Sequence, residues 1–208
     1  MIVHSYASDS IDRRLAPWGI AICAVGVAYG YGLLSDAYQF SLPWWFETPS
    51  VMLAYGLFHW VYDSWLWKLR VRGCGLSQIP NCTGTWYGEL RSSHDGRTTI
   101  EGMLVVHQTW SRIVVEFQSE SSASYSRMAS LNVTPGASQG LIYEYTNDPR
   151  AEAKETMHAH RGFAFLRLSA DGNWLDGDYY TGRDRTNFGR MRVRLVSRKR
   201  LDVQKAKK

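Results

Sequence analysis

This chain of 208 residues lacks the short motifs that identify the common enzyme classes. It has no Gly-x-Ser-x-Gly nucleophile elbow, no glycine-rich phosphate loop and no zinc signature. It has only three cysteines, Cys23, Cys74 and Cys82, which are too few for a disulfide framework. Cys74 and Cys82 can be grouped with His158 and His160, but their spacing matches no zinc pattern. We therefore expect no catalysis, no metal and no cofactor.

Long apolar runs are missing from the last two thirds of the chain, whereas the first third has two, at about 15–34 and 49–67. Twenty helical residues span about 30 Å, the thickness of the bilayer hydrocarbon. A cleaved signal peptide fits the first run poorly, because the run is long and no small-x-small cleavage site follows it. The sequence predicts a transmembrane hairpin of two helices over residues 1–72.

The segment between the two runs, residues 35–48, contains no lysine or arginine. Basic residues lie instead on the outer sides of the runs: Arg13, Arg14, Lys68, Arg70 and Arg72. Cytoplasmic flanks are enriched in such residues. We therefore expect a multi-pass protein of the bacterial inner membrane, with both termini and the rest of the chain in the cytoplasm.

Four residues in the predicted spans are candidates for membrane or oligomer contacts. Gly26 and Gly30 form a Gly-x-x-x-Gly pair, which permits close helix approach, although membrane helices also simply tolerate glycine. His59 and Asp63 lie one helical turn apart, and ionisable residues inside spans are functional candidates. Asp63 is also close enough to the end of its span to reach the interface.

From Gly84 onward the residues alternate with a period of two, interrupted by turn signals such as Asp95-Gly96 and Asp171-Gly172. The alternation predicts eight strands, at about 84–92, 98–109, 111–121, 122–133, 139–146, 158–169, 173–181 and 187–197. An all-β domain of this kind favours a compact eight-stranded antiparallel up-and-down β-barrel, because closure removes exposed edges; a β-sandwich is the alternative. The predicted order along the chain is hairpin (1–72), linker (73–83), barrel (84–197) and basic tail (198–208). A basic tail beside a membrane is attracted to anionic lipid, and no motif suggests that it binds duplex nucleic acid.

The same alternation predicts which side chains face the barrel interior. The predicted inward sets are Trp86, Gly88 and Leu90; Ile113, Val115 and Phe117; Tyr125, Arg127, Ala129, Leu131 and Val133; Leu141, Tyr143 and Tyr145; Leu175, Tyr179 and Thr181; and Met191, Val193 and Leu195. Arg190, Arg192 and Arg194 then face outward. A buried arginine needs an anion or a carboxylate, which points to an anionic ligand. Solvated arginines at the barrel mouth and tyrosines in an ordinary core remain the alternatives.

Five segments in a fixed order resemble a known family. They are Gly-Thr-Trp-Tyr-Gly-Glu-Leu (84–90), Ser-Ala-Ser-Tyr-Ser (122–126), Leu-Ile-Tyr-Glu-Tyr-Thr-Asn-Asp-Pro (141–149), His-Arg-Gly (160–162) and Leu-Asp-Gly-Asp-Tyr-Tyr-Thr-Gly-Arg-Asp-Arg-Thr (175–186). Behind two predicted spans, they are similar to the two-transmembrane β-barrel effectors of bacterial anti-phage systems built around cyclic-nucleotide signalling (CBASS). The opening Gly-x-Trp also resembles lipocalins, which are typically exported and unanchored.

The resemblance implies a non-catalytic effector. A partner nucleotidyltransferase would make a cyclic dinucleotide, the barrel would bind it, and homo-oligomers would disrupt the membrane in abortive infection. A related arrangement, in which the nucleotide silences the effector, stays open. Two functions of other classes also remain: a membrane-tethered barrel for a lipid or another small ligand, and a non-catalytic subunit of a membrane complex.

A cyclic dinucleotide carries two phosphates, which bind arginine or N–H donors, and two bases, which stack on aromatic rings. With the resemblance, these requirements select nine candidate ligand-binding residues: Trp86, Tyr125, Arg127, Tyr143, Tyr145, Tyr179, Thr181, Arg183 and Thr186. The sequence leaves the identity of the bases open.

Overall fold

The computed structural model describes residues 3–39, 50–71, 74–93, 98–134, 139–149, 159–182 and 187–201. The described chain forms two compact units. One unit is helical and covers residues 10–78. The other is the β-domain, which contains residues 3–9 together with the chain from Ile79 onward.

The helical unit consists of α1 (Asp12–Tyr38), α3 (Ser50–Ser64), the 3-10 helix η1 (Leu66–Lys68) and a small strand pair, β3 (Arg70–Val71) and β4 (Cys74–Gly75). α1 has 27 residues and is about 40 Å long. Of the described helices, it alone is long and apolar enough to cross a bilayer. The described part of α3 has 15 residues and is about 22 Å long, so the described part of the predicted second span is helical and shorter than the hydrocarbon layer of a bilayer.

Small side chains let α1 and α3 approach each other. A hollow of about 220 Å³ between them is lined by Ala21, Ala24, Val25, Val51, Met52 and Tyr55. Ala24 is fully buried. In contrast, a methyl group added at Gly26 or Gly30 would meet no atom within 4 Å. Within the described chain, the predicted glycine pair therefore takes no part in the contact between the two helices.

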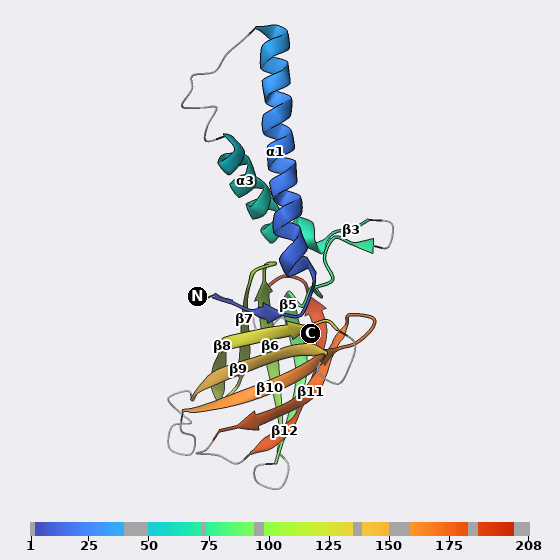
Figure 1. Cartoon of the computed structure of the whole chain (residues 1–208). Coiled ribbons are helices and arrows are strands. Elements are labelled where there is room, and N and C mark those ends of the chain that lie inside the picture. Colours follow the sequence, from blue (N-terminus) through green and yellow to red (C-terminus); the bar gives the residue numbers. More distant parts are fainter. Residues whose placement is uncertain are drawn as a thin grey trace. The chain divides into compact units, whose positions relative to one another are not determined.

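The β-domain is an eight-stranded antiparallel barrel (Figure 1). Its strands are β5 (Gly84–Ser92), β6 (Thr99–Gln108), β7 (Arg112–Ser119), β8 (Ser122–Asn132), β9 (Gly140–Pro149), β10 (His160–Leu168), β11 (Trp174–Thr181) and β12 (Phe188–Ser197). Each strand pairs with the next along the chain, and β12 pairs with β5 to close the barrel. All eight predicted strands are confirmed, with ends displaced by a few residues.

The barrel has two chemically different ends. We call the end at which Asp9 and Ile79 lie the stem end, because there the chain passes to the helical unit. An apolar layer fills the stem half with fully buried side chains: Trp86, Leu104, Ile113, Leu131, Leu166, Leu175 and Val193. Burial of each large apolar side chain contributes roughly 1.5–3 kcal/mol. The stem half is therefore a packed core, and the hollow part of the barrel lies toward the opposite end, the pocket end.

A β-bulge in β8 corrects two predicted orientations. Ser126 pairs with Tyr145, but Met128 pairs with Glu144, so Arg127 is an extra residue in the strand. An extra residue reverses which side chains face inward before and after it. Leu131 faces inward as predicted, whereas Tyr125, 45% exposed, and Arg127 lie on the outer surface. The predicted inward orientation of Tyr125 and Arg127 is wrong for this reason.

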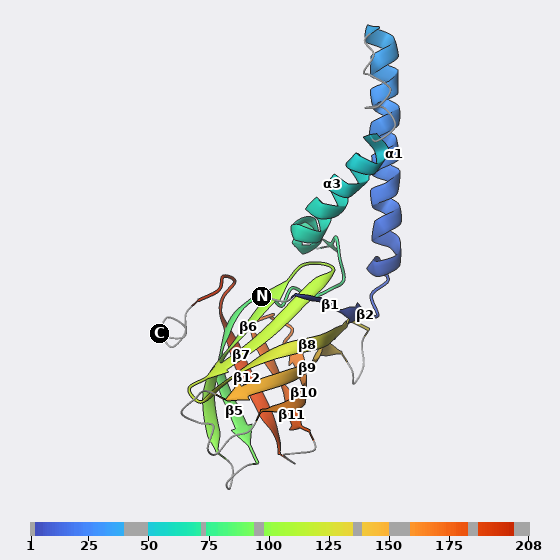
Figure 2. The same ribbon diagram turned by 90° about the vertical axis from the view of Figure 1, so that its left-hand side faces the viewer.

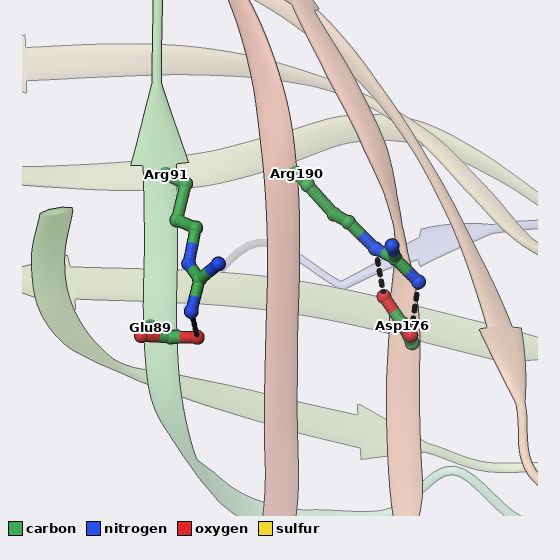
Figure 3. Close-up of polar contacts among 4 residues, drawn as sticks. All are labelled: Glu89, Arg91, Asp176 and Arg190. Carbon is green, nitrogen blue, oxygen red and sulfur yellow. Dashed lines mark hydrogen bonds and ion pairs between the residues drawn. The ribbon is translucent and has the colours of Figure 1, made fainter. Parts of the chain in front are cut away.

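The outer face of β5, β12 and β11 carries paired charges (Figure 3). Arg190 donates two hydrogen bonds to the carboxylate of Asp176, at 2.8 and 2.7 Å, and Arg91 donates one to Glu89 at 2.7 Å. These exposed ion pairs contribute little to stability. Arg190, Arg192 and Arg194 are all exposed, which confirms that the arginines of β12 point away from the interior, as the alternation predicts.

The ends of the chain add to the barrel. Residues 3–9 carry two short strands, β1 (His4–Ser5) and β2 (Ala7–Ser8), which lie beside the ends of β7 and β8 (Figure 2). At the other terminus, Thr85 Oγ1 bonds the Lys199 carbonyl and the Leu201 N–H. The first residues of the predicted basic tail are therefore attached to β5.

Candidate ligand-binding site

The pocket end of the barrel encloses a hollow of about 420 Å³. Its lining comes from all eight strands or the residues that flank them: Leu90, Ser92, Thr98, Ile100, Phe117, Ser119, Ser121, Ser122, Ser124, Tyr143, Tyr145, Asn147, His160, Tyr179, Thr181, Asn187 and Met191. These residues come together because the barrel brings the ends of β5, β7, β9 and β11 next to the starts of β6, β8, β10 and β12. The result is a cavity with an apolar floor and polar walls.

Two tyrosines of the wall lie against glycines on the neighbouring strands. Tyr145 is paired with Gly162, and a methyl group added at Gly162 would come within 2.3 Å of the Tyr145 ring. Tyr179 is paired with Gly189, where an added methyl group would come within 2.6 Å of the Tyr179 ring. Only glycine permits this close approach. The two rings are thereby held in place along the cavity wall.

Another part of the wall consists of hydroxyl and amide groups. Ser119, Ser122 and Ser124 are buried at the turn between β7 and β8, and the Ser122 N–H donates to Ser119 Oγ at 3.1 Å. Asn147 is 4% exposed and lies across the ladder from Ser124. Hydroxyl groups donate and accept hydrogen bonds, and amides do both at fixed positions. This wall can therefore bind phosphate oxygens or the edges of bases.

The tyrosines of the site are neutral at physiological pH. Burial raises the pKa of Tyr143, and burial with the neighbouring Tyr179 raises the pKa of Tyr145. Burial also raises the pKa of Tyr179, although a hydrogen bond with Ser92 opposes that rise. Among its described residues, the lining has no lysine, arginine or carboxylate. The groups that it offers to an anion are therefore hydroxyls, amides and the ring of His160.

The structure brings four of the nine predicted ligand-binding residues together in this hollow: Tyr143, Tyr145, Tyr179 and Thr181. Thr181 also has a structural role, since its hydroxyl donates to the Asn187 carbonyl at 2.9 Å and accepts from the Asn187 N–H at 3.0 Å. Arg183 and Thr186 lie outside the described residues.

Trp86 lies in the stem half of the barrel and does not line the hollow. It is fully buried, and its indole N–H donates to the Cys82 carbonyl at 3.0 Å. The structure therefore places Trp86 in the packed core, where it anchors the segment that enters β5.

Tyr125 and Arg127 line a separate groove on the outer surface, together with His4, Val114, Glu116, Ser126, Thr146 and Arg200. Glu116 is buried at its base and pairs with Arg200 at 3.1 Å. This groove is on the other side of the sheet from the hollow. The predicted residues are thus divided between two surfaces of the barrel.

The two ionisable residues predicted in the second span both lie on α3. The His59 ring stacks on Tyr55, with 6.1 Å between the ring centroids. Asp63 follows one turn later in the same helix. Their predicted role in membrane or oligomer contacts stays a prediction.

The sequence reasoning missed most of the polar wall. For Ser122 and Ser124 the sequence contains a signal, because three alternating serines, Ser122, Ser124 and Ser126, precede the bulge at Arg127. The interval from Ser126 to Ala129 breaks the alternation by one residue and marks the change of face. His160 and Asn187 carry no such signal, because only barrel closure brings them to the cavity.

Comparison with known proteins agrees with this geometry. Residues 77–195, more than half of the chain, match the family described as Cap15, cyclic dinucleotide receptor domain. The CD-NTase-associated protein 15 of Yersinia aleksiciae is 33% identical over 141 residues, which cover 68% of this chain and 66% of that protein. The aligned part thus spans just under two thirds of that relative. The chain belongs to the Cap15 family of cyclic dinucleotide receptor domains.

Proposed function

We propose that this chain is a CBASS effector whose barrel binds a cyclic dinucleotide in the hollow at the pocket end and thereby controls a membrane-anchored helical unit. The relative's name refers to a CD-NTase, and we propose that such a nucleotidyltransferase supplies the ligand. Homo-oligomerisation and disruption of the bacterial inner membrane are the proposed output. The chain's own residues would bind and signal rather than catalyse.

One observation carries this proposal: the receptor domain of the family encloses a cavity whose walls combine tyrosine rings with hydroxyl and amide groups. The rings of Tyr145 and Tyr179 offer faces on which bases can stack. The hydroxyl and amide groups elsewhere in the wall suit phosphate oxygens and the edges of bases. A purely apolar ligand would leave these buried polar groups unpaired, which disfavours a lipid-chain carrier.

The test is calorimetry of the full-length protein in detergent micelles against cyclic di-AMP, cyclic di-GMP, cyclic di-UMP and the mixed cyclic GMP–AMP. We expect at least one of them to bind. In the Tyr145→Leu variant, we expect a loss of roughly five- to 150-fold in affinity, because a base–aromatic stack is worth about 1–3 kcal/mol.

The matched control is Tyr125→Leu, the same substitution on the outer face of the same sheet. We expect it to leave the affinity within about twofold, since Tyr125 does not line the hollow. Binding that is lost in Tyr125→Leu and kept in Tyr145→Leu would move the site to the outer groove. Failure of every cyclic dinucleotide to bind would refute the proposed function.

A further inference from the structure

The pairing between β7 and β8 is short, and the two strands separate toward the stem end. Only three residue pairs join them: Glu116–Tyr125, Phe117–Ser124 and Gln118–Ala123. On the pocket side of these pairs, the same strands carry Ser119 and Ser122 of the hollow. On the stem side, each strand continues without the other as its partner. We call this divergence the seam.

The N-terminal arm, residues 4–9, fills the seam. Its β1 pairs antiparallel with β7, His4 opposite Ile113 and Ser5 opposite Arg112. Its β2 pairs parallel with β8, Ala7 opposite Ser130 and Ser8 opposite Leu131. The arm therefore supplies the ladder hydrogen bonds that β7 and β8 do not make with each other.

Side chains hold the arm in the seam. Ser126, at the bulge, accepts a hydrogen bond from the Val115 N–H at 2.9 Å, and its Oγ lies 2.8 Å from His4 Nε2. Further along the arm, the Asp9 carboxylate accepts from the Val133 and Thr134 N–H groups at 2.6 and 3.0 Å. The position of the arm in the seam therefore depends on the positions of β7 and β8 relative to each other.

A single buried amide joins the arm to the returning chain. Gln108, the last residue of β6, is 4% exposed. Its Nε2 donates to Tyr6 Oη at 3.3 Å and to the Pro80 carbonyl at 3.1 Å, and its Oε1 accepts from the Cys82 N–H at 2.8 Å. Tyr6 belongs to the segment that leads to α1, whereas Pro80 and Cys82 belong to the segment that comes back from the helical unit. Gln108 therefore holds both connections at one point of the barrel.

We propose that the seam and the Gln108 amide transmit ligand binding from the hollow to both connections of the helical unit, a form of regulation that rests on the proposed function. Ligand contacts with Ser119 or Ser122 act on β7 and β8 at one side of the three residue pairs, and contacts with Ser124 act on one of the pairs themselves. The arm is seated between the same strands on the other side. Only Ser10 and Ile11 lie between the arm and α1, so a change in the position of the arm is transmitted directly to α1.

The first measurement is hydrogen–deuterium exchange of the full-length protein in micelles, with and without the cyclic dinucleotide that calorimetry finds to bind most tightly. We expect saturating ligand to change the exchange rates of residues 4–9 and 79–83 by roughly fivefold or more, the lower end of measured couplings between sites. The stem-end turn between β10 and β11, residues 169–173, lines neither the hollow nor the seam and should exchange as before.

The second measurement uses reciprocity, because coupled sites alter each other's equilibria by the same factor. Ser126→Ala removes a hydroxyl that accepts one backbone N–H at 2.9 Å and holds the arm. Ser169→Ala is the matched control, since Ser169 Oγ accepts the Trp174 N–H at 2.9 Å in the β10–β11 hairpin. We expect Ser126→Ala to change ligand affinity and arm exchange together, and Ser169→Ala to change neither.

Tyr6→Phe tests the same link if Ser126→Ala fails to fold, because it removes only the hydroxyl that contacts Gln108 and the Thr109 carbonyl. Ligand that binds without altering exchange of the arm, with Ser126→Ala or Tyr6→Phe equal to Ser169→Ala in affinity, would overturn this inference and leave the proposed function standing. Absence of binding to the parent protein would overturn both.

Discussion

His107, on the outer face of β6, is a residue from which we predict a pH-dependent contribution to the stability of the barrel. Its Nε2 is buried and has no hydrogen-bond partner among the described residues. Burial lowers the pKa of His107, and Arg200 lowers it further, although the Glu116 carboxylate opposes the shift. A histidine whose folded pKa is depressed contributes stability that is complete above its unfolded pKa, about 6.5. That stability is lost as the pH falls through about 6.5 and levels off below the folded pKa.

We therefore predict that the melting temperature of the full-length protein in micelles falls between pH 8 and pH 5.5. The fall should amount to roughly 2–4 °C for each kcal/mol lost. His107→Gln, which cannot titrate, should flatten this dependence, whereas His160→Gln in the pocket should retain it. Equal pH profiles for the parent and His107→Gln would show that other groups are responsible.

Arg127 shows how one extra residue in a strand makes part of the predicted site wrong. Strict alternation places it inward, but the bulge makes it the unpaired residue of β8 and leaves it on the surface. The extra residue reverses the faces of the residues that precede it in the strand, so Tyr125 lies on the outer face and Ser124 lines the hollow. The serines at 122, 124 and 126 were the available signal, because small hydroxyl residues can line a cavity as well as a surface.

At the scale of an element, α1 presents the Gly-x-x-x-Gly pair without a partner inside the described chain. We predict that Gly26→Leu with Gly30→Leu leaves expression and membrane insertion intact, because a methyl group added at either position meets no atom of the described chain within 4 Å. If this face contacts a second copy, the larger side chains prevent close approach. Killing by the activated effector should then fall at least about tenfold, measured as surviving colonies and with a membrane-potential dye.

The control for this prediction is Gly32→Leu. An added methyl group at Gly32 also meets nothing within 4 Å, but Gly32 lies on a different face of the helix from Gly26 and Gly30. It should leave killing unchanged. Undiminished killing by the Gly26→Leu, Gly30→Leu double variant would remove the glycine pair from the oligomer contact.

At the scale of the whole molecule, the distribution of basic residues predicts two membrane crossings, with both termini on the same side. The short described length of α3 makes the second crossing the part that needs testing. The 15 described residues of this helix are about 8 Å short of a hydrocarbon layer of about 30 Å. The absence of lysine and arginine from residues 35–48 nevertheless predicts that this segment is translocated. Reporter fusions in 35–48 and at the C-terminus should therefore report opposite sides of the membrane. Reports from the same side would show that the chain does not return through the bilayer at α3.

The sequence by itself determined the eight strands, the long apolar helix and the outward arginines of β12. Alternation, apolar length and turn residues such as Asp171-Gly172 act over a few neighbours, so they can be read locally. Only the tertiary structure decided that the arm belongs to the barrel, that Arg127 is a bulge and that Trp86 is core. Each depends on pairings between residues far apart in the chain, such as Ser8 with Leu131 and Ser126 with Tyr145. Such pairings form because buried backbone groups require partners wherever the closed barrel places them.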